Sequence, residues 1–213
     1  MRTAFVLLFV LCLTVPTLAA PTATLEYRFW LQQPQSWSVL ELRQQSSPTR
    51  GFRLWGATGK DDCDYGSCFD NTFWGLDLTY RLRQSNHWAY VGYYNLARAV
   101  VYDESSQQMG HSGFRVGVLG AFSLTTHTSL VYDAAYLPFD QFRITNDGPN
   151  GTPSGQGNGI TYRVGLRYTL SPSVYIEGGR WSMGFNLPAC PTCTGAFRDH
   201  VWEGPYLTVG VSR

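Results

Sequence analysis

The sequence predicts an all-β protein: a closed antiparallel up-and-down barrel of about ten strands, with eight strands as the alternative count. The first observation is alternation, because large apolar or aromatic residues take every second position in one segment after another, the pattern of a β-strand. The second is rhythm, since short turn signals alternate with long polar segments from residue 46 onward. The third is composition: aromatic residues make up 15% of the chain, and the 22 glycines suit a narrow interior.

The clearest strand pair is residues 160–178. Its first arm has large apolar or aromatic residues at every even position, and polar, charged or glycine residues at every odd one. The sequence Ser-Pro-Ser then supplies a tight turn. If this turn pairs Leu170 with Val174, Arg167 lies directly opposite Glu177, within reach of a cross-strand ion pair.

The return arm contains Gly178 and Gly179, which together predict a β-bulge. Such a bulge reverses the inward and outward positions, so we expect Arg180 to point inward and Trp181 outward. The same alternation predicts the remaining strands, although it is least regular in the first third of the chain. These strands are residues 24–31, 38–44, 51–57, 72–83, 88–97, 114–122, 130–136 and 207–211.

Short turns and long loops sort to opposite rims of such a barrel. The short turns fall near residues 46, 85, 126 and 172, and the long polar loops are residues 59–71, 102–112, 139–159 and 184–200. An even number of strands puts both chain ends at the short-turn rim. If Ser85, Asn86 and His87 form a three-residue turn, Asp77 lies opposite Asn95.

Residues 1–20 have the features of a secretory signal peptide, with Arg2 before an apolar run of about a dozen residues and small residues up to Ala20. We expect cleavage after Ala20 and one barrel domain at residues 21–213. Without Arg2 the remaining 15 basic residues balance the 15 acidic ones, so charge gives no reason to expect nucleic-acid binding. Lys60 is the only lysine.

The whole mature chain resembles the outer-membrane β-barrels of diderm bacteria, which have short turns at one rim and long loops at the other. The resemblance is to the class, and no motif selects one family within it. It implies an outer-membrane location, membrane lipid and the barrel assembly machinery as partners, an apolar outer face and a polar lumen. Tryptophans at strand ends favour aromatic belts at the membrane interfaces. They are Trp74, Trp88, Trp181 and Trp202.

A secreted soluble β-barrel or sandwich with an aromatic core, able to bind a small apolar ligand, is the alternative fold. In the membrane barrel, the polar faces of the strands line the lumen. The expected lumen charge network is Asp77, Arg81, Arg83, Arg115, Asp133, Arg163, Arg167 and Glu177. This network either plugs the barrel with salt bridges or forms a narrow pore or small-anion site, and small barrels favour the plug.

The four cysteines of the mature chain predict disulfides, because an exported protein meets oxidising conditions. Three pairings are possible, and we prefer Cys63 with Cys68 and Cys190 with Cys193, each within one outer loop. A redox centre at the second pair and a four-thiolate zinc site are the alternatives. The acidic residues of the first long loop faintly resemble a calcium loop without its final glutamate. We therefore predict neither a metal nor another cofactor.

Two enzyme families with the barrel fold offer alternative functions. Ten-stranded omptin proteases use paired acids and an Asp/His couple at the outer rim, and Asp61–Asp62 and Asp199–His200 lie in long loops here. Barrel-type lipid A deacylases use a His/Ser couple, to which His111–Ser112 is similar. Neither match is specific, and no catalytic residue is assigned. The sequence therefore favours a structural or surface-interaction role, or a narrow small-solute pore, over an enzyme.

Overall fold

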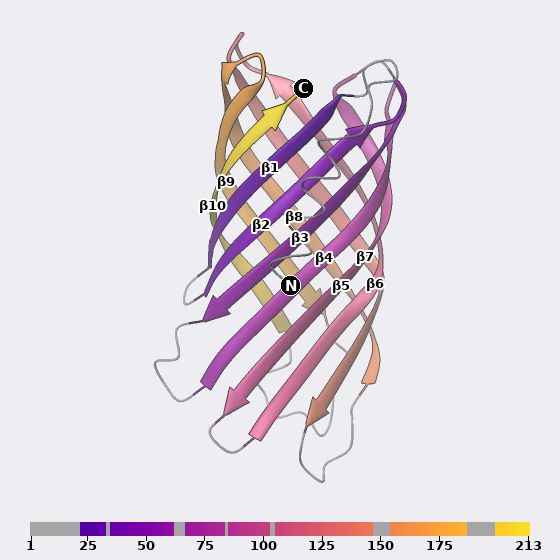
Figure 1. The fold of residues 1–213 in the computed structure, drawn as a ribbon. Helices are drawn as coiled ribbons and strands as arrows, with labels where there is room; N and C mark the ends of the chain where they lie inside the picture. The colour runs from indigo at the N-terminus through magenta and orange to yellow at the C-terminus, as the bar shows by residue number, and fades with distance from the viewer. Residues whose placement is uncertain are drawn as a thin grey trace.

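The computed structural model is a closed barrel of ten antiparallel strands, in agreement with the predicted fold and strand number (Figure 1). The structure describes residues 22–32, 35–61, 67–83, 85–102, 105–146, 154–186 and 199–213. The predicted signal peptide at residues 1–20 lies outside them. The strands are β1 (Ala23–Gln32), β2 (Gln35–Gln45), β3 (Arg50–Asp61), β4 (Ser67–Arg81), β5 (His87–Tyr102), β6 (Ser105–Ser123), β7 (Thr128–Asn146), β8 (Ser154–Ser171), β9 (Val174–Asn186) and β10 (Asp199–Ser212).

Each strand pairs with its neighbours in sequence, and β1 pairs with β10 to close the sheet. Closure is completed at the short-turn rim, where the Ala23 amide donates to the Arg213 carbonyl at 3.3 Å. A closed sheet leaves no unpaired strand edge, which is a requirement for spanning hydrocarbon. No helix in the described ranges is long and apolar enough to cross a membrane.

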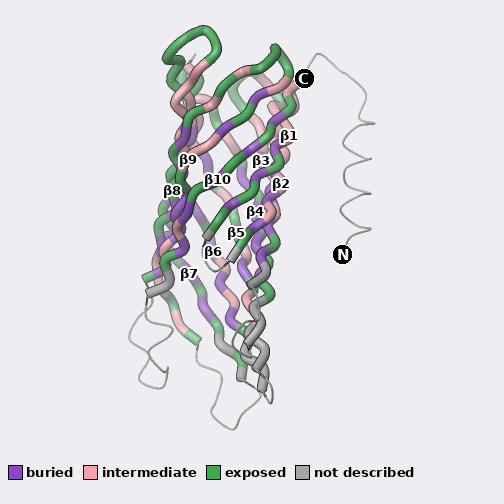
Figure 2. Tube along the Cα trace, turned by 90° about the vertical axis from the view of Figure 1, so that its left-hand side faces the viewer, coloured by how far each residue is buried: buried purple, intermediate pink, exposed green. Residues whose placement is uncertain are grey.

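The outer face of the barrel is apolar, and the interior holds buried charged side chains as well as buried aromatic ones. On β8 the outward side chains include Ile160 and Leu170, 58% and 57% exposed, whereas on β1 the inward Glu26 is fully buried. Figure 2 shows buried and exposed residues alternating along the strands. An exterior of this kind is stable only against lipid, so the chain is a membrane barrel and the soluble alternative is excluded.

The strands are longer than the sequence predicted, and the predicted long loops are correspondingly shorter. β6 and β7 have 19 residues each and take up most of residues 102–112 and part of 139–159. Beyond the apolar belt the outward positions become polar, as at Gln141 and Arg143, while strand pairing continues. The alternation that predicted the strands therefore ends before the strands do. Figure 1 shows β4 to β7 extending furthest at the loop rim.

The hairpin registers test two sequence predictions. Arg167 faces Glu177 across β8 and β9, as predicted. The pairing of Asp77 with Asn95 was wrong, because Asp77 faces Gly92 instead. The turn between β4 and β5 is longer than three residues: the Leu82 amide donates to the His87 carbonyl at 2.8 Å, and this shifts the register.

The predicted bulge at Gly178 and Gly179 is absent from β9, whose pairing with β8 continues through both residues. The inward and outward positions therefore do not reverse. Trp181 is buried in the interior and Arg180 is exposed on the outer face, opposite to the prediction. The glycines instead provide space, since a Cβ at Gly179 would lie 2.1 Å from the Val164 carbonyl oxygen.

Candidate functional site

The lumen is the candidate functional site, and its short-turn half contains two clusters of ion pairs. The first, here called the Glu26 cluster, joins β1 and β2 to β8 and β9. Glu26 is its centre: Arg28 lies 2.8 Å away, Arg167 3.2 Å and Arg43 3.4 Å. The Tyr175 hydroxyl donates to the same carboxylate at 2.5 Å. The full cluster is Glu26, Arg28, Glu41, Arg43, Arg163, Arg167 and Glu177.

Glu177 is the second acceptor of the Glu26 cluster. Arg167 binds it at 2.7 Å, and the Tyr206 hydroxyl donates to it at 2.8 Å. On the opposite side of the cluster, Glu41 accepts from Arg43 at 2.5 Å. Each carboxylate is almost fully buried, and a buried carboxylate is stable only with partners of this kind.

The second cluster, here called the Asp77 cluster, comprises Arg53, Asp77, Arg115 and Asp133. Asp77 accepts hydrogen bonds from Arg53 Nε at 2.6 Å and from Arg115 Nε at 2.7 Å. Arg53 also pairs with Asp133 on β7, so this contact crosses the lumen from β3. The Tyr90 hydroxyl donates to Asp133 at 2.7 Å, and the Arg53 guanidinium lies over the Tyr90 ring.

A small cavity of about 20 Å³ lies where the two clusters meet. Its lining includes Arg28 and Arg163 from one cluster and Arg53 and Asp133 from the other. This volume accommodates about one water molecule. In the described part of the chain, Arg163 Nε and Nη1 are buried without a hydrogen-bond acceptor, so the cavity is suited to an oxygen ligand or a small anion. The clusters otherwise fill the cross-section.

The loop half of the lumen is filled by aromatic and aliphatic side chains instead. Trp30 stacks on Trp181 with ring centroids 4.5 Å apart, and Trp30 Nε1 donates to the Gly204 carbonyl at 3.2 Å. We call this group the aromatic plug. It consists of Trp30, Trp37, Val39, Trp55, Ala57, Phe73, Tyr94, Leu96, Leu137, Trp181, Met183, Phe185, Trp202 and Tyr206.

Glycines on nearby strands make room for the large inward side chains. A Cβ at Gly165 would lie 2.2 Å from the Tyr206 hydroxyl, and one at Gly210 would lie 2.1 Å from the Tyr175 ring. Tyr175 on β9 therefore leans across β10 to reach Glu26 on β1, and Tyr206 on β10 leans over β9, where it meets Glu177. This close packing leaves little free space at the level of the clusters, whereas a cavity of about 180 Å³ lies nearer the short-turn rim, lined by residues that include Arg43, Trp88 and Leu119.

The predicted interfacial tryptophans do not share one location. Trp74 is on the outer face, 46% exposed, as an interfacial residue would be. Trp181 and Trp202 are buried in the aromatic plug, so their interfacial assignment was wrong. Trp88 also faces inward, packing against the buried Tyr90 at the short-turn rim. The predictions relied on the position of each tryptophan near a strand end. Whether a side chain points inward or outward depends instead on its place in the alternation along the strand.

Six of the eight residues predicted for the lumen network lie in the two clusters: Asp77, Arg115, Asp133, Arg163, Arg167 and Glu177. Arg81 and Arg83 do not belong to them, because β4 ends at Arg81. Arg81 Nε donates to the Ser85 carbonyl at 2.6 Å, and Arg83 is exposed in the turn with a φ of 54°.

Sequence reasoning missed the contribution of the first three strands to both clusters. The missed residues are Glu26, Arg28, Glu41, Arg43 and Arg53. All five occupy the polar positions of an alternating strand, so the signal was present. Their omission came from the irregular pattern of this part of the chain.

His111 on β6 forms a separate buried group with Asp140 and Tyr94. Its Nδ1 lies 2.6 Å from one Asp140 oxygen, and the Tyr94 hydroxyl donates to the other at 2.6 Å. The imidazole stacks on Phe185 at 4.3 Å, and its Nε2 has no partner in the described part of the chain. Since consecutive residues point to opposite faces, His111 and Ser112 do not form the His/Ser couple considered above.

Several predictions fall where the structure gives no side-chain description. Cys63, Cys190 and Cys193 lie outside the described residues, and only the backbone of Cys68 is described, so both disulfides stay predictions. Asp62 also lies outside, and no side chain is described for Asp61, Asp199 or His200. Within the described ranges, no three His, Cys, Asp or Glu side chains come together as a metal site would require.

Known structures share the barrel fold at very low sequence identity. The outer membrane protease OmpT from Escherichia coli is 10% identical over 93% of this chain and 97% of its own, with a TM-score of 0.53. The translocator domain of the autotransporter NalP from Neisseria meningitidis is also 10% identical, over 99% of this chain and 94% of its own, with a TM-score of 0.49. No family model and no curated protein sequence matches the chain.

The likeness to OmpT establishes the fold, and the apolar exterior decides the location. Membrane β-barrels of this type, with an apolar band outside and polar residues inside, belong to the outer membrane. The chain is therefore an outer-membrane β-barrel, as the sequence predicted.

Proposed function

We propose that this protein is a closed outer-membrane barrel that presents its outer loops at the cell surface and conducts no solute. The observation that carries the proposal is the filled lumen. A solute moving along the barrel axis would meet the Glu26 and Asp77 clusters in one half and the aromatic plug in the other. The cavity between the clusters accommodates about one water molecule.

The ionic clusters and the aromatic plug resist opening of the lumen for different reasons. Removing one partner of a buried ion pair costs about 3–5 kcal/mol, because the other charge stays buried without compensation. Separating the Trp30–Trp181 stack would expose large apolar surfaces inside the barrel. Thermal fluctuation alone therefore opens the lumen rarely, which favours a structural and surface-interaction role over a small-solute pore.

Single-channel recording in planar bilayers tests the proposal. We expect no conductance steps from the wild-type protein, and small steps from a double variant Trp30→Ala with Trp181→Ala, because its plug loses two stacked rings. Trp74→Ala is the matched control, since Trp74 faces outward. Regular conductance steps from wild-type protein would overturn the closed-barrel proposal and favour a pore.

A further inference from the structure

An ion pair on the outer face interrupts the apolar belt of the barrel. Arg180 on β9 and Glu203 on β10 both point outward, and Arg180 Nε lies 2.5 Å from a Glu203 carboxylate oxygen. The Arg180 side chain is 64% exposed and the Glu203 side chain 33%. Exposed apolar side chains lie on either side of the pair, with Ile176 and Leu207 toward the short-turn rim and Val201 toward the loop rim.

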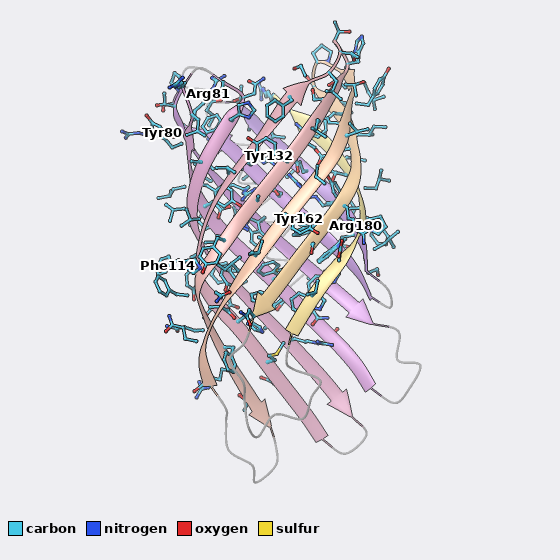
Figure 3. All side chains as sticks on the ribbon, turned by 180° about the vertical axis from the view of Figure 1, so that it is seen from behind. Tyr80, Arg81, Phe114, Tyr132, Tyr162 and Arg180 are labelled. Carbon is cyan, nitrogen blue, oxygen red and sulfur yellow. The ribbon has the colours of Figure 1, made fainter. Side chains whose placement is uncertain are left out.

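The register places this ion pair beside the middle of the belt. Arg180 lies opposite Val164 on β8. Val164 is the third of six consecutive outward residues on β8, from Ile160 to Leu170, all of which are apolar or aromatic and exposed. Figure 3 shows Arg180 on the outer wall of the barrel, at a height between those of Tyr80 and Phe114. The two charges therefore face hydrocarbon.

The position leaves the arginine poorly satisfied. A guanidinium has five N–H donors, and Glu203 is the acceptor that the described residues provide to Arg180. Lipid chains offer no acceptors, so the remaining donors and the second carboxylate oxygen require a protein partner or water. Arginine is also strongly disfavoured at the centre of a lipid-facing barrel surface. A charged pair retained here indicates a surface that another protein covers.

Few large side chains project from the outward face of β9 around the ion pair, so a second protein surface has room to approach closely. Of the outward positions flanking Arg180, Gly178 and Gly184 carry no side chain, and the small Ser182 side chain is buried between its neighbours. A Cβ at Gly178 would meet no atom nearer than 3.7 Å, so the space outside it is open. Small residues permit two protein surfaces to approach closely within a membrane.

We propose that β9 and β10 form a dimer interface with a second copy of this chain. Two copies inserted in the same direction are related by a two-fold axis along the membrane normal. Such an axis brings Arg180 of each copy to Glu203 of the other, because the surface carries both charges side by side. The resulting ring of two arginines and two glutamates supplies the acceptors that each monomer lacks and excludes lipid from them.

Charge reversal separates this proposal from an ion pair that acts only within one chain. We expect Arg180→Glu alone and Glu203→Arg alone each to weaken dimerisation at least tenfold, because like charges then meet across the axis. Mixing the two variants restores opposite charges in both contacts between the copies. We therefore expect a mixed dimer to form from two differently tagged variants that do not dimerise separately.

The experiment measures dimer formation in lipid nanodiscs or vesicles by crosslinking and by pull-down of the second tag. Arg143→Glu is the matched control, since Arg143 is exposed on β7 beyond the apolar belt. The change in gel mobility on heating verifies that each variant is folded. Wild-type protein that stays monomeric at high density in the bilayer overturns the proposal. A mixed sample that dimerises no better than either variant alone also overturns it.

Discussion

The two halves of the lumen lie inside the same closed sheet but are filled by different kinds of side chain. In the short-turn half, six arginines and five carboxylates connect strands that are distant in the sheet, as Arg53 on β3 does with Asp133 on β7. In the loop half, rings such as Trp30 and Trp181 pack by shape. Ion pairs between distant strands depend on each partner being present, whereas close-packed rings depend on volume. The two halves should therefore respond to different substitutions.

The largest expected effect is in the ionic half. Glu26→Gln keeps the shape of the side chain but removes the charge that several arginines share, so we expect a loss of about 5 kcal/mol of unfolding free energy. Urea titration in detergent, followed by tryptophan fluorescence, measures the loss. Asp70→Asn is the control, because Asp70 is exposed. Equal stability of the two variants would mean that the Glu26 cluster contributes no net stability.

A slightly smaller effect is expected in the aromatic plug. Trp30→Ala leaves a cavity beside Trp181 and frees the Gly204 carbonyl, so we expect a loss of about 4 kcal/mol. The same titration applies, with Trp74→Ala as the outward-facing control. If both substitutions lower the unfolding free energy equally, the inward ring of Trp30 contributes no more to stability than the outward ring of Trp74, which contacts detergent.

The smallest effect is expected where the aromatic plug contacts the Glu26 cluster. Gly165→Ala places a methyl group against the Tyr206 hydroxyl and moves it away from Glu177, and we expect a cost of about 2 kcal/mol. Gly110→Ala is the control, since the nearest atom, the Leu96 carbonyl oxygen, would lie 3.8 Å from the added Cβ. Thermal unfolding followed by gel mobility measures both. A neutral Gly165→Ala would show that Tyr206 can move without loss.

The sequence by itself determined the fold class, the strand number and six of the eleven residues of the two ionic clusters. A strand can be recognised from its period of two without knowing the rest of the chain, because its side chains point alternately to its two faces. A short turn also limits the registers of the hairpin, which is why the contact of Arg167 with Glu177 was predictable, although Val174 pairs with Ser171 and not with the predicted Leu170. The missed charges of β1 to β3 followed the same rule in a less regular segment.

The tertiary structure alone decided the contacts across the lumen, the parity of β9 and the extent of the strands. Arg53 and Asp133 are 80 residues apart, and only barrel closure brings them together. Whether two glycines form a bulge or make room for a neighbour depends on the packing around them, as at Gly179. This packing turns Trp181 inward and Arg180 outward, so the unusual charge on the lipid face becomes visible only in the closed barrel.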